Sequence, residues 1–183
     1  MKAHPRSACG ASPSRGRLQR PGKAGSAAAA GLLLCAALGA QAQERKNWFN
    51  DPFAQVTSGF PNCPVPREPG ITKEEMAELA HIRAQHGTSC HLSGRCRLAN
   101  SYLYDKEIIP RAVQYIRLDG RFGDTSVWVL GERRLVTLMG CVKTRQQKEE
   151  MERTVRQVDD VMGVVNQLMV GTGEKPKYPL ATP

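Results

Sequence analysis

Two stretches between residues 105 and 171 repeat one helical spacing of apolar side chains, and this repetition constrains the fold more than any other feature. In each stretch the apolar residues fall at positions i, i+4 and i+7, which predicts an amphipathic helix with one face to bury. The stripes are formed by Ile109, Val113 and Ile116 in the first stretch and by Met151, Val155 and Val158 in the second. Both helices therefore need a common apolar surface.

Short β-rich runs supply that surface. Residues 125–130 and 135–139 are rich in valine, threonine and leucine, and the four residues 131–134 between them contain a glycine, which suits a hairpin. Gly163 ends the second helix, and residues 164–170 form the third predicted strand. A right-handed strand–helix–strand crossover places the third strand parallel to the second. The pattern predicts an α/β (α+β) two-layer sandwich, with two helices on one face of a three-stranded sheet.

Two runs of this segment, each containing a glycine, carry a family resemblance. They are residues 135–142, Leu-Val-Thr-Leu-Met-Gly-Cys-Val, and residues 161–168, Val-Met-Gly-Val-Val-Asn-Gln-Leu. The first is similar to the second strand, with its glycine, and the second to the last strand of the BON domain, a small module named after bacterial osmotically induced and nodulation-related proteins. Residues 105–171 therefore resemble a BON domain. The resemblance covers about a third of the chain, and a single such domain is expected.

The resemblance implies an αββαβ fold, no catalytic residues, and a binding role in the cell envelope, with phospholipid surfaces as the expected partner. The residues that it carries over are structural. Gly140 is expected to end the second strand, Gly163 to make the turn from helix to strand, and Asn166 and Leu168 to set the third strand.

Residues 1–42 have the composition of a cleavable signal peptide. They contain six basic residues and no acidic one, followed by an apolar run at 27–40 and the cleavage pattern Ala40-Gln41-Ala42. The run is too short to span a bilayer. We expect the mature chain to begin at Gln43; a mitochondrial transit peptide is the alternative. Without the leader the formal net charge falls from +9 to +3, which requires no nucleic-acid partner.

Residues 43–104 form a predicted extension that contains one helix, and residues 172–183 a flexible tail. Five prolines between residues 43 and 70 argue against regular structure there. A helix is expected at about 72–86, with Thr72 and Glu75 as a capping box and Gly87 at its end. The aromatic residues of the Pro-rich part either pack on the domain or bind a partner; they are Trp48, Phe49, Phe53 and Phe60.

Four cysteines remain after removal of the leader, and in an exported chain they indicate two disulfides with three possible connectivities. We favour Cys90–Cys96, which closes a short loop, and Cys63–Cys141, which ties the extension to the sheet. The neighbouring histidines raise the alternative of a metal or haem site, but their spacing scatters them around a helix. No metal or cofactor is predicted. These histidines are His81, His86 and His91.

The sequence contains no nucleophile elbow, phosphate-binding loop or dinucleotide fingerprint, so we do not expect an enzyme. Lys143, Arg145 and Lys148 lie at the start of the second helix, where free N–H groups favour anions. Together with Arg133 and Arg134 on the hairpin loop, they are candidates for contact with anionic lipid. The alternative is an ordinary solvated face.

The leading functional hypothesis is a periplasmic or envelope-associated binding protein that contacts phospholipid or an envelope protein and supports envelope integrity. A second hypothesis is a disulfide-stabilised structural or assembly subunit, in which the aromatic arm docks on another envelope protein. A third is a metal- or haem-binding protein that uses the histidines and cysteines. No transmembrane span is expected in the mature chain.

Overall fold

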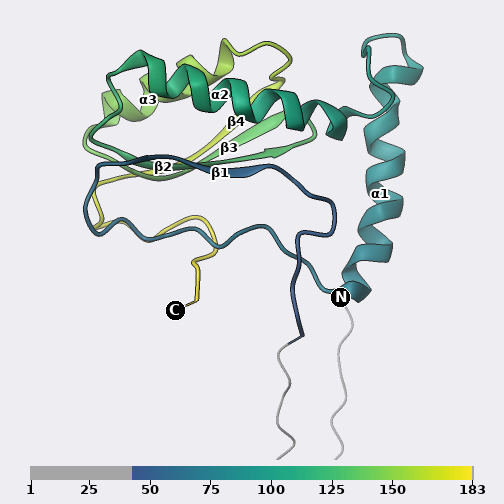
Figure 1. The fold of residues 1–183 in the computed structure, drawn as a ribbon, viewed down its shortest axis with the longest axis horizontal. Helices are drawn as coiled ribbons and strands as arrows, with labels where there is room; N and C mark the ends of the chain where they lie inside the picture. Colours follow the sequence, from purple (N-terminus) through teal and green to yellow (C-terminus); the bar gives the residue numbers. More distant parts are fainter. Residues whose placement is uncertain (1–42, 183) are drawn as a thin grey trace, which may run out of the picture. The chain divides into compact units, whose positions relative to one another are not determined.

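A computed structural model describes residues 43–182; the predicted signal peptide lies outside the described residues. The chain forms a four-stranded mixed sheet with strand order β1-β2-β3-β4 (Figure 1). The elements, in chain order, are β1 (Phe53–Ser58), α1 (Lys73–Leu92), the 3-10 helix η1 (Ser101–Tyr104), α2 (Asp105–Asp119), β2 (Ser126–Glu132), β3 (Leu135–Val142), α3 (Arg145–Arg156) and β4 (Gly163–Val170).

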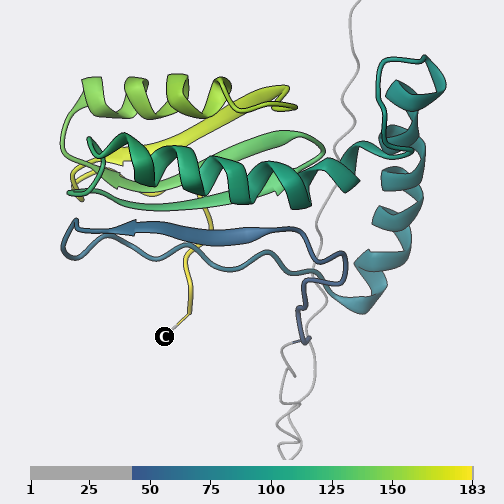
Figure 2. The ribbon, with the colours of Figure 1, turned by 45° about the horizontal axis from the view of Figure 1, so that its top comes forward.

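Helices α2 and α3 cover one face of the sheet (Figures 1 and 2), and they do so with the two apolar stripes. Ile109 and Ile116 are buried and Val113 is partly buried against the core. Met151, Val155 and Val158 on the α3 side are also buried. β2 and β3 pair antiparallel, and β3 and β4 pair parallel. The predicted αββαβ sandwich is therefore confirmed.

The expectation of irregular structure throughout residues 43–70 was wrong, because this segment contributes β1, a fourth strand. β1 pairs antiparallel with β2 and is bulged between Gln55 and Thr57. Its six residues, Phe-Ala-Gln-Val-Thr-Ser, contain no proline and lie between Pro52 and Pro61. All six can therefore donate backbone N–H groups to a ladder, which the prolines around them cannot.

The second face of the sheet is covered by the extension and the C-terminal segment, which run along it in Figure 2. Tyr178 is buried there, and its hydroxyl donates to the Pro64 carbonyl at 3.0 Å. A β-bridge joins Pro66 to Leu180. One aromatic side chain and these backbone bonds thus connect the described part of the predicted tail to the extension. The residues of this cluster are Trp128, Met139, Cys141, Met169 and Tyr178, with Phe53, Phe60, Cys63 and Leu130 packed against them.

Helix α1 begins as predicted, with the reciprocal capping box of Thr72 and Glu75. It does not end at Gly87 but continues to Leu92. Gly87 serves close packing instead, because a Cβ there would lie 2.2 Å from the Asn100 side-chain oxygen. The glycine is therefore required by a neighbour that is distant in sequence, which local pattern cannot show.

Most of α1 is exposed, and it lies beyond one end of the sheet (Figures 1 and 2). Arg83 anchors its middle. The guanidinium makes a bidentate ion pair with Asp51 and lies over the rings of Phe49 and Tyr102, at 4.2 and 3.8 Å from the centroids. Phe49 therefore serves internal packing, as do Phe53 and Phe60. Trp48, the fourth aromatic residue of the arm, is 40% exposed.

Both edge strands of the sheet have backbone groups that are bonded to side chains. On β4, the Leu168 N–H donates to Asn166 Oδ1 at 3.2 Å, and the Leu168 carbonyl accepts from Lys148 Nζ. On β1, Arg117 from α2 donates to the carbonyl of Val56 at the bulge, at 3.1 Å. Unpaired edge groups of this kind are otherwise available to another strand.

Candidate functional site

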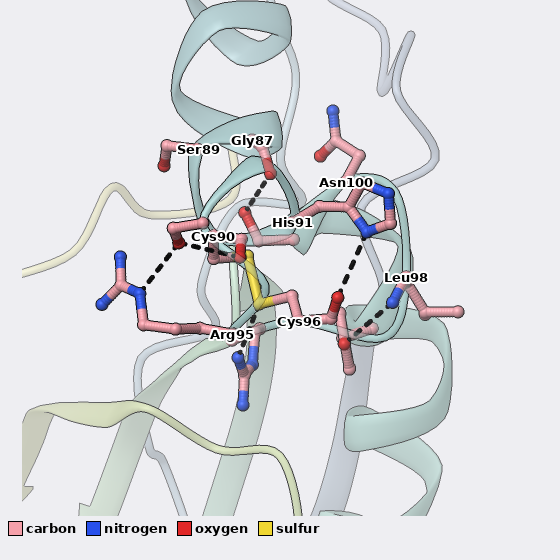
Figure 3. Close-up of a disulfide and its surroundings, with 12 residues drawn as sticks. Gly87, Ser89, Cys90, His91, Arg95, Cys96, Leu98 and Asn100 are labelled. Carbon is pink, nitrogen blue, oxygen red and sulfur yellow. Dashed lines mark hydrogen bonds between the residues drawn. A yellow bond between two sulfur atoms is a disulfide. The ribbon is translucent and has the colours of Figure 1, made fainter.

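The structure contains two disulfides, Cys63–Cys141 and Cys90–Cys96, the pairing that we favoured from the sequence. Cys63–Cys141 joins the extension to β3, within the apolar cluster on the second face of the sheet, and its Cα atoms are 5.8 Å apart. Cys90–Cys96 joins the last turn of α1 to the loop that follows it (Figure 3). The first is part of the core, whereas the second shapes a surface.

The loop closed by Cys90–Cys96 is held in place by hydrogen bonds on both sides (Figure 3). The His91 ring nitrogen Nδ1 lies 3.1 Å from the Cys96 carbonyl oxygen. Ser101 Oγ donates to the Gly87 carbonyl at 3.1 Å. The end of α1 and the start of the α2 segment are thereby fixed to each other at this loop.

The β2–β3 hairpin turn lies next to this loop and has an unusual composition. Glu132 pairs with Leu135, so the turn has two residues, Arg133 and Arg134, with φ of 55° and 66°. The four-residue connection that we expected was wrong, because its first two residues belong to β2. A two-residue turn with both φ positive normally takes Asn-Gly or a similar pair. Two arginines here need a compensating contact.

Asp105 provides that contact from the start of α2. Its two carboxylate oxygens accept the backbone N–H groups of Arg133 and Arg134, each at 2.7 Å. The residue is fully buried, and this burial raises the pKa of the Asp105 carboxyl from its ordinary value of 3.8 to about 6, although the two N–H donors act in the opposite direction. A buried carboxylate therefore holds the arginine turn.

Arg134 points inward from this turn. Its Nε donates to the Asp160 carbonyl at 2.8 Å, its Nη1 lies 3.2 Å from Cys96 Sγ, and the guanidinium lies 4.6 Å from the Tyr104 ring centroid. The Asp160 carboxylate lies within 4 Å of guanidinium groups of Arg97, Arg111 and Arg134. Asp160 is thus the centre of an ion-pair network.

A cavity of about 410 Å³ opens between α1, the disulfide loop and the hairpin turn. We call it the disulfide pocket. Arg95 and Arg133 lie in its wall, and within residues 43–182 neither makes an ion pair with a carboxylate. Among the described residues that line the pocket there is no Asp or Glu. The lining consists of Gln85, His86, Ser89, Cys90, Arg95, Cys96, Ser101, Arg133, Arg134 and Met162.

The cations at the start of α3 are arranged differently. Lys143 pairs with Asp124 at 3.0 Å, Arg145 pairs with Glu149, and Lys148 is bonded to the Leu168 carbonyl. The first turn of α3 already has its own cap, because the N-cap hydroxyl of Thr144 accepts the N–H of the third helical residue. One of the N–H groups that the sequence suggested as open donors is therefore already bonded.

The structure does not bring the five lipid-contact candidates together. Arg133 and Arg134 precede β3, and the other three candidates follow it. The 8 residues of β3 place the two groups at opposite ends of a strand, about 25 Å apart at the usual rise. Of the five, only Arg133 and Arg134 border the disulfide pocket. Sequence analysis missed Arg95 and His86 as their neighbours, because the loop and α1 meet the hairpin only through tertiary contacts.

The glycine and asparagine positions of the predicted motif have identifiable structural roles. Gly140 lies inside β3, not at its end as expected, with φ of 121°, and a Cβ there would be 2.0 Å from the Ser126 carbonyl oxygen. Gly163 opens β4. Asn166 ties β4 to α3, because its amide donates to the Lys148 carbonyl and the Glu152 carboxylate, both at 3.1 Å.

The three histidines are spread over α1, and only His86 reaches the pocket. In the part of the chain that the structure describes, no three His, Cys, Asp or Glu side chains form a group able to hold a metal ion. Within the same residues, no helix is both long and apolar enough to cross a membrane.

Comparison with known families identifies residues 105–172 as a BON domain, and this is a single copy. The match covers the elements from α2 to β4, which form the αββαβ part of the fold. BON domains are generally non-catalytic binding modules, often associated with membrane or envelope binding. A search of curated proteins finds no match to the chain.

Proposed function

We propose that this BON-domain protein is an exported, non-catalytic binding protein that contacts the anionic phospholipid surface of the envelope and supports envelope integrity. The observation that carries the proposal is the BON domain at residues 105–172 together with two disulfides. Disulfides persist in oxidising compartments such as the periplasm. The signal peptide at residues 1–42 and the mature start at Gln43 belong to the same proposal.

The contact surface that we propose is the end of the molecule around the disulfide pocket, centred on Arg133 and Arg95. Exposed apolar side chains accompany these cations, since Met162 is 64% exposed at the pocket and Leu92, at the end of α1, is 81% exposed. Basic residues near an anionic surface contribute about 1 kcal/mol each. Apolar side chains beside them strengthen membrane binding, because their surface is buried at the boundary between headgroups and acyl chains.

Vesicle flotation tests this function directly. The oxidised protein from periplasmic expression is mixed with vesicles of phosphatidylcholine alone or with phosphatidylglycerol added. We expect co-flotation with the anionic vesicles and its loss at high salt, since exposed charges are screened within about 10 Å at 0.1 M salt. Equal flotation with both vesicle types, or none with either, would refute the lipid contact. Cross-linking in cells that recovers one stoichiometric protein would favour an assembly subunit instead.

A further inference from the structure

The disulfide pocket brings cationic and hydrogen-bonding side chains together from three separate segments. Arg95 comes from the disulfide loop, Arg133 from the hairpin turn and His86 from α1. Arg133 Nη1 lies 3.4 Å from His86 Nδ1. The guanidinium can only donate, so His86 Nδ1 accepts this hydrogen bond and the other ring nitrogen of His86 is left as an N–H donor. The described lining contains no acidic residue, so the charges of Arg95 and Arg133 are not balanced by a carboxylate within it.

The backbone that presents Arg133 is also specialised. The residue has a positive φ, in a turn position where Asn or Gly is usual, and it is held there by the buried Asp105. Non-glycine residues in this region of φ carry a conformational cost, and such positions cluster at ligand sites. The side chain of Arg133 itself is half-buried, with His86 as its neighbour. The turn, with its unfavourable backbone conformation, therefore positions the Arg133 guanidinium at the pocket.

The shape of the pocket distinguishes between classes of anion. Donors that approach from three segments suit a tetrahedral phosphate with several free oxygens, whereas a planar carboxylate is best met by one coplanar pair of donors. Guanidinium groups are well matched to phosphate oxygens. The cavity, at about 410 Å³, also has room for a substituent, and Cys90, Cys96 and Met162 provide an apolar side for it.

We propose that the disulfide pocket binds the phosphate group of an organic phosphate ester through Arg95 and Arg133, with His86 as a third contact. This inference rests on the proposed function only in that a phospholipid headgroup is one source of the ester; a soluble phosphate ester is the other. The Cys90–Cys96 disulfide is part of the site, because it fixes the loop that carries Arg95 beside the hairpin.

The first experiment titrates the ¹⁵N-labelled, oxidised protein with sn-glycerol 3-phosphate, and with acetate as the carboxylate control. We expect saturable shifts of the backbone amides of Arg95, Arg133 and Ser89 with the phosphate ester only. Shifts of equal size and affinity with acetate, or no localised shifts with glycerol phosphate and with phosphatidylglycerol nanodiscs, would overturn the proposal. Binding of glycerol phosphate without binding of nanodiscs would support the pocket and assign it a soluble ligand.

Matched variants test the residues. Arg133→Gln and Arg95→Gln should each weaken binding of the phosphate probe about tenfold, the effect expected for one charge-assisted contact. Arg153→Gln removes the same charge from an exposed side chain on α3 that is not a lipid-contact candidate, and binding should stay unchanged. If all three variants weaken binding equally, the effect is one of net charge and the pocket proposal fails. If anionic vesicles float all three as well as wild type, lipid binding itself holds, whereas the contact surface proposed for it and the lipid form of this inference both fail.

A double variant tests the disulfide. Cys90→Ser combined with Cys96→Ser leaves Cys63–Cys141 in place, and a retained cooperative melting transition shows that the domain is folded. We expect the phosphate probe to bind this folded variant at least tenfold more weakly. Wild-type affinity would show that the loop is positioned without the disulfide and would remove it from the site.

Discussion

Replacement of Asp105 by asparagine perturbs the residue that holds the arginine turn. In the wild type, both carboxylate oxygens accept backbone N–H groups, from Arg133 and Arg134. An asparagine retains one acceptor oxygen and places an NH₂ group against the second N–H. Asp105→Asn therefore removes the titratable group and one of the two hydrogen bonds while the side chain keeps nearly the same volume.

The pH dependence of this substitution follows from the raised pKa of Asp105. The pKa of the Asp105 carboxyl is about 6 in the folded protein and 3.8 ordinarily, and burial of the carboxylate is the main cause of the rise. The charge of Asp51 raises this pKa as well, whereas the two N–H donors and the charge of Arg83 lower it. Between these values the folded protein binds more protons than the unfolded chain. The stability that this group contributes is therefore fully present below pH 3.8 and is lost as the pH rises through 6. The total is about 3 kcal/mol, of which about 2 kcal/mol is lost between pH 4 and 7.

Urea denaturation of both proteins at several pH values between 4 and 7 measures this effect. We expect the free energy of unfolding of the wild type, relative to Asp105→Asn, to fall by about 2 kcal/mol over this range. Amide exchange at Arg133 and Arg134 should be faster in the variant, because one N–H loses its acceptor. A difference that is independent of pH would show that Asp105 does not titrate in this range and would refute the reasoning.

Three further substitutions test the fold. Removal of Cys63–Cys141 by serine at both positions should lower the free energy of unfolding by about 4.5 kcal/mol, from the 78-residue separation, as measured by urea denaturation under oxidising conditions. Asn166→Ala should cost about 2 kcal/mol in the same assay, since it removes the bonds between β4 and α3; an unchanged midpoint would contradict this role. Gly140→Ala should abolish cooperative thermal unfolding or lower the melting temperature by more than 10 °C, since its φ is 121° and a Cβ would meet a backbone oxygen at 2.0 Å. Gly123→Ala, where a Cβ meets nothing within 4 Å, is its control.

The αββαβ part of the fold could be predicted because its signals are local and agree with one another. Each apolar stripe lies on one helical segment, and the two β-rich runs correspond to neighbouring strands, β2 and β3. Each signal fixes which face of an element is buried, and only one small sheet is available to cover. The BON resemblance depended on these same residues.

The extension, the tail and the pocket could not be predicted in this way, because their structure depends on distant partners. β1 is ordered by pairing with β2, more than sixty residues later, and Tyr178 reaches back to Pro64. The pocket exists only where the disulfide loop meets the hairpin turn. The conformation of the two-arginine turn could not be predicted either, because arginine does not favour a positive φ. Asp105, which holds the turn, lies 28 residues before Arg133.

The side chains bonded to the edges of the sheet have a consequence for how copies of this protein meet. A chain that extended the sheet at β4 would have to displace Lys148 and Asn166 from the Leu168 backbone, and at β1 it would have to displace Arg117 from the bulge. Crowded copies are thereby discouraged from growing into fibrils through strand exchange.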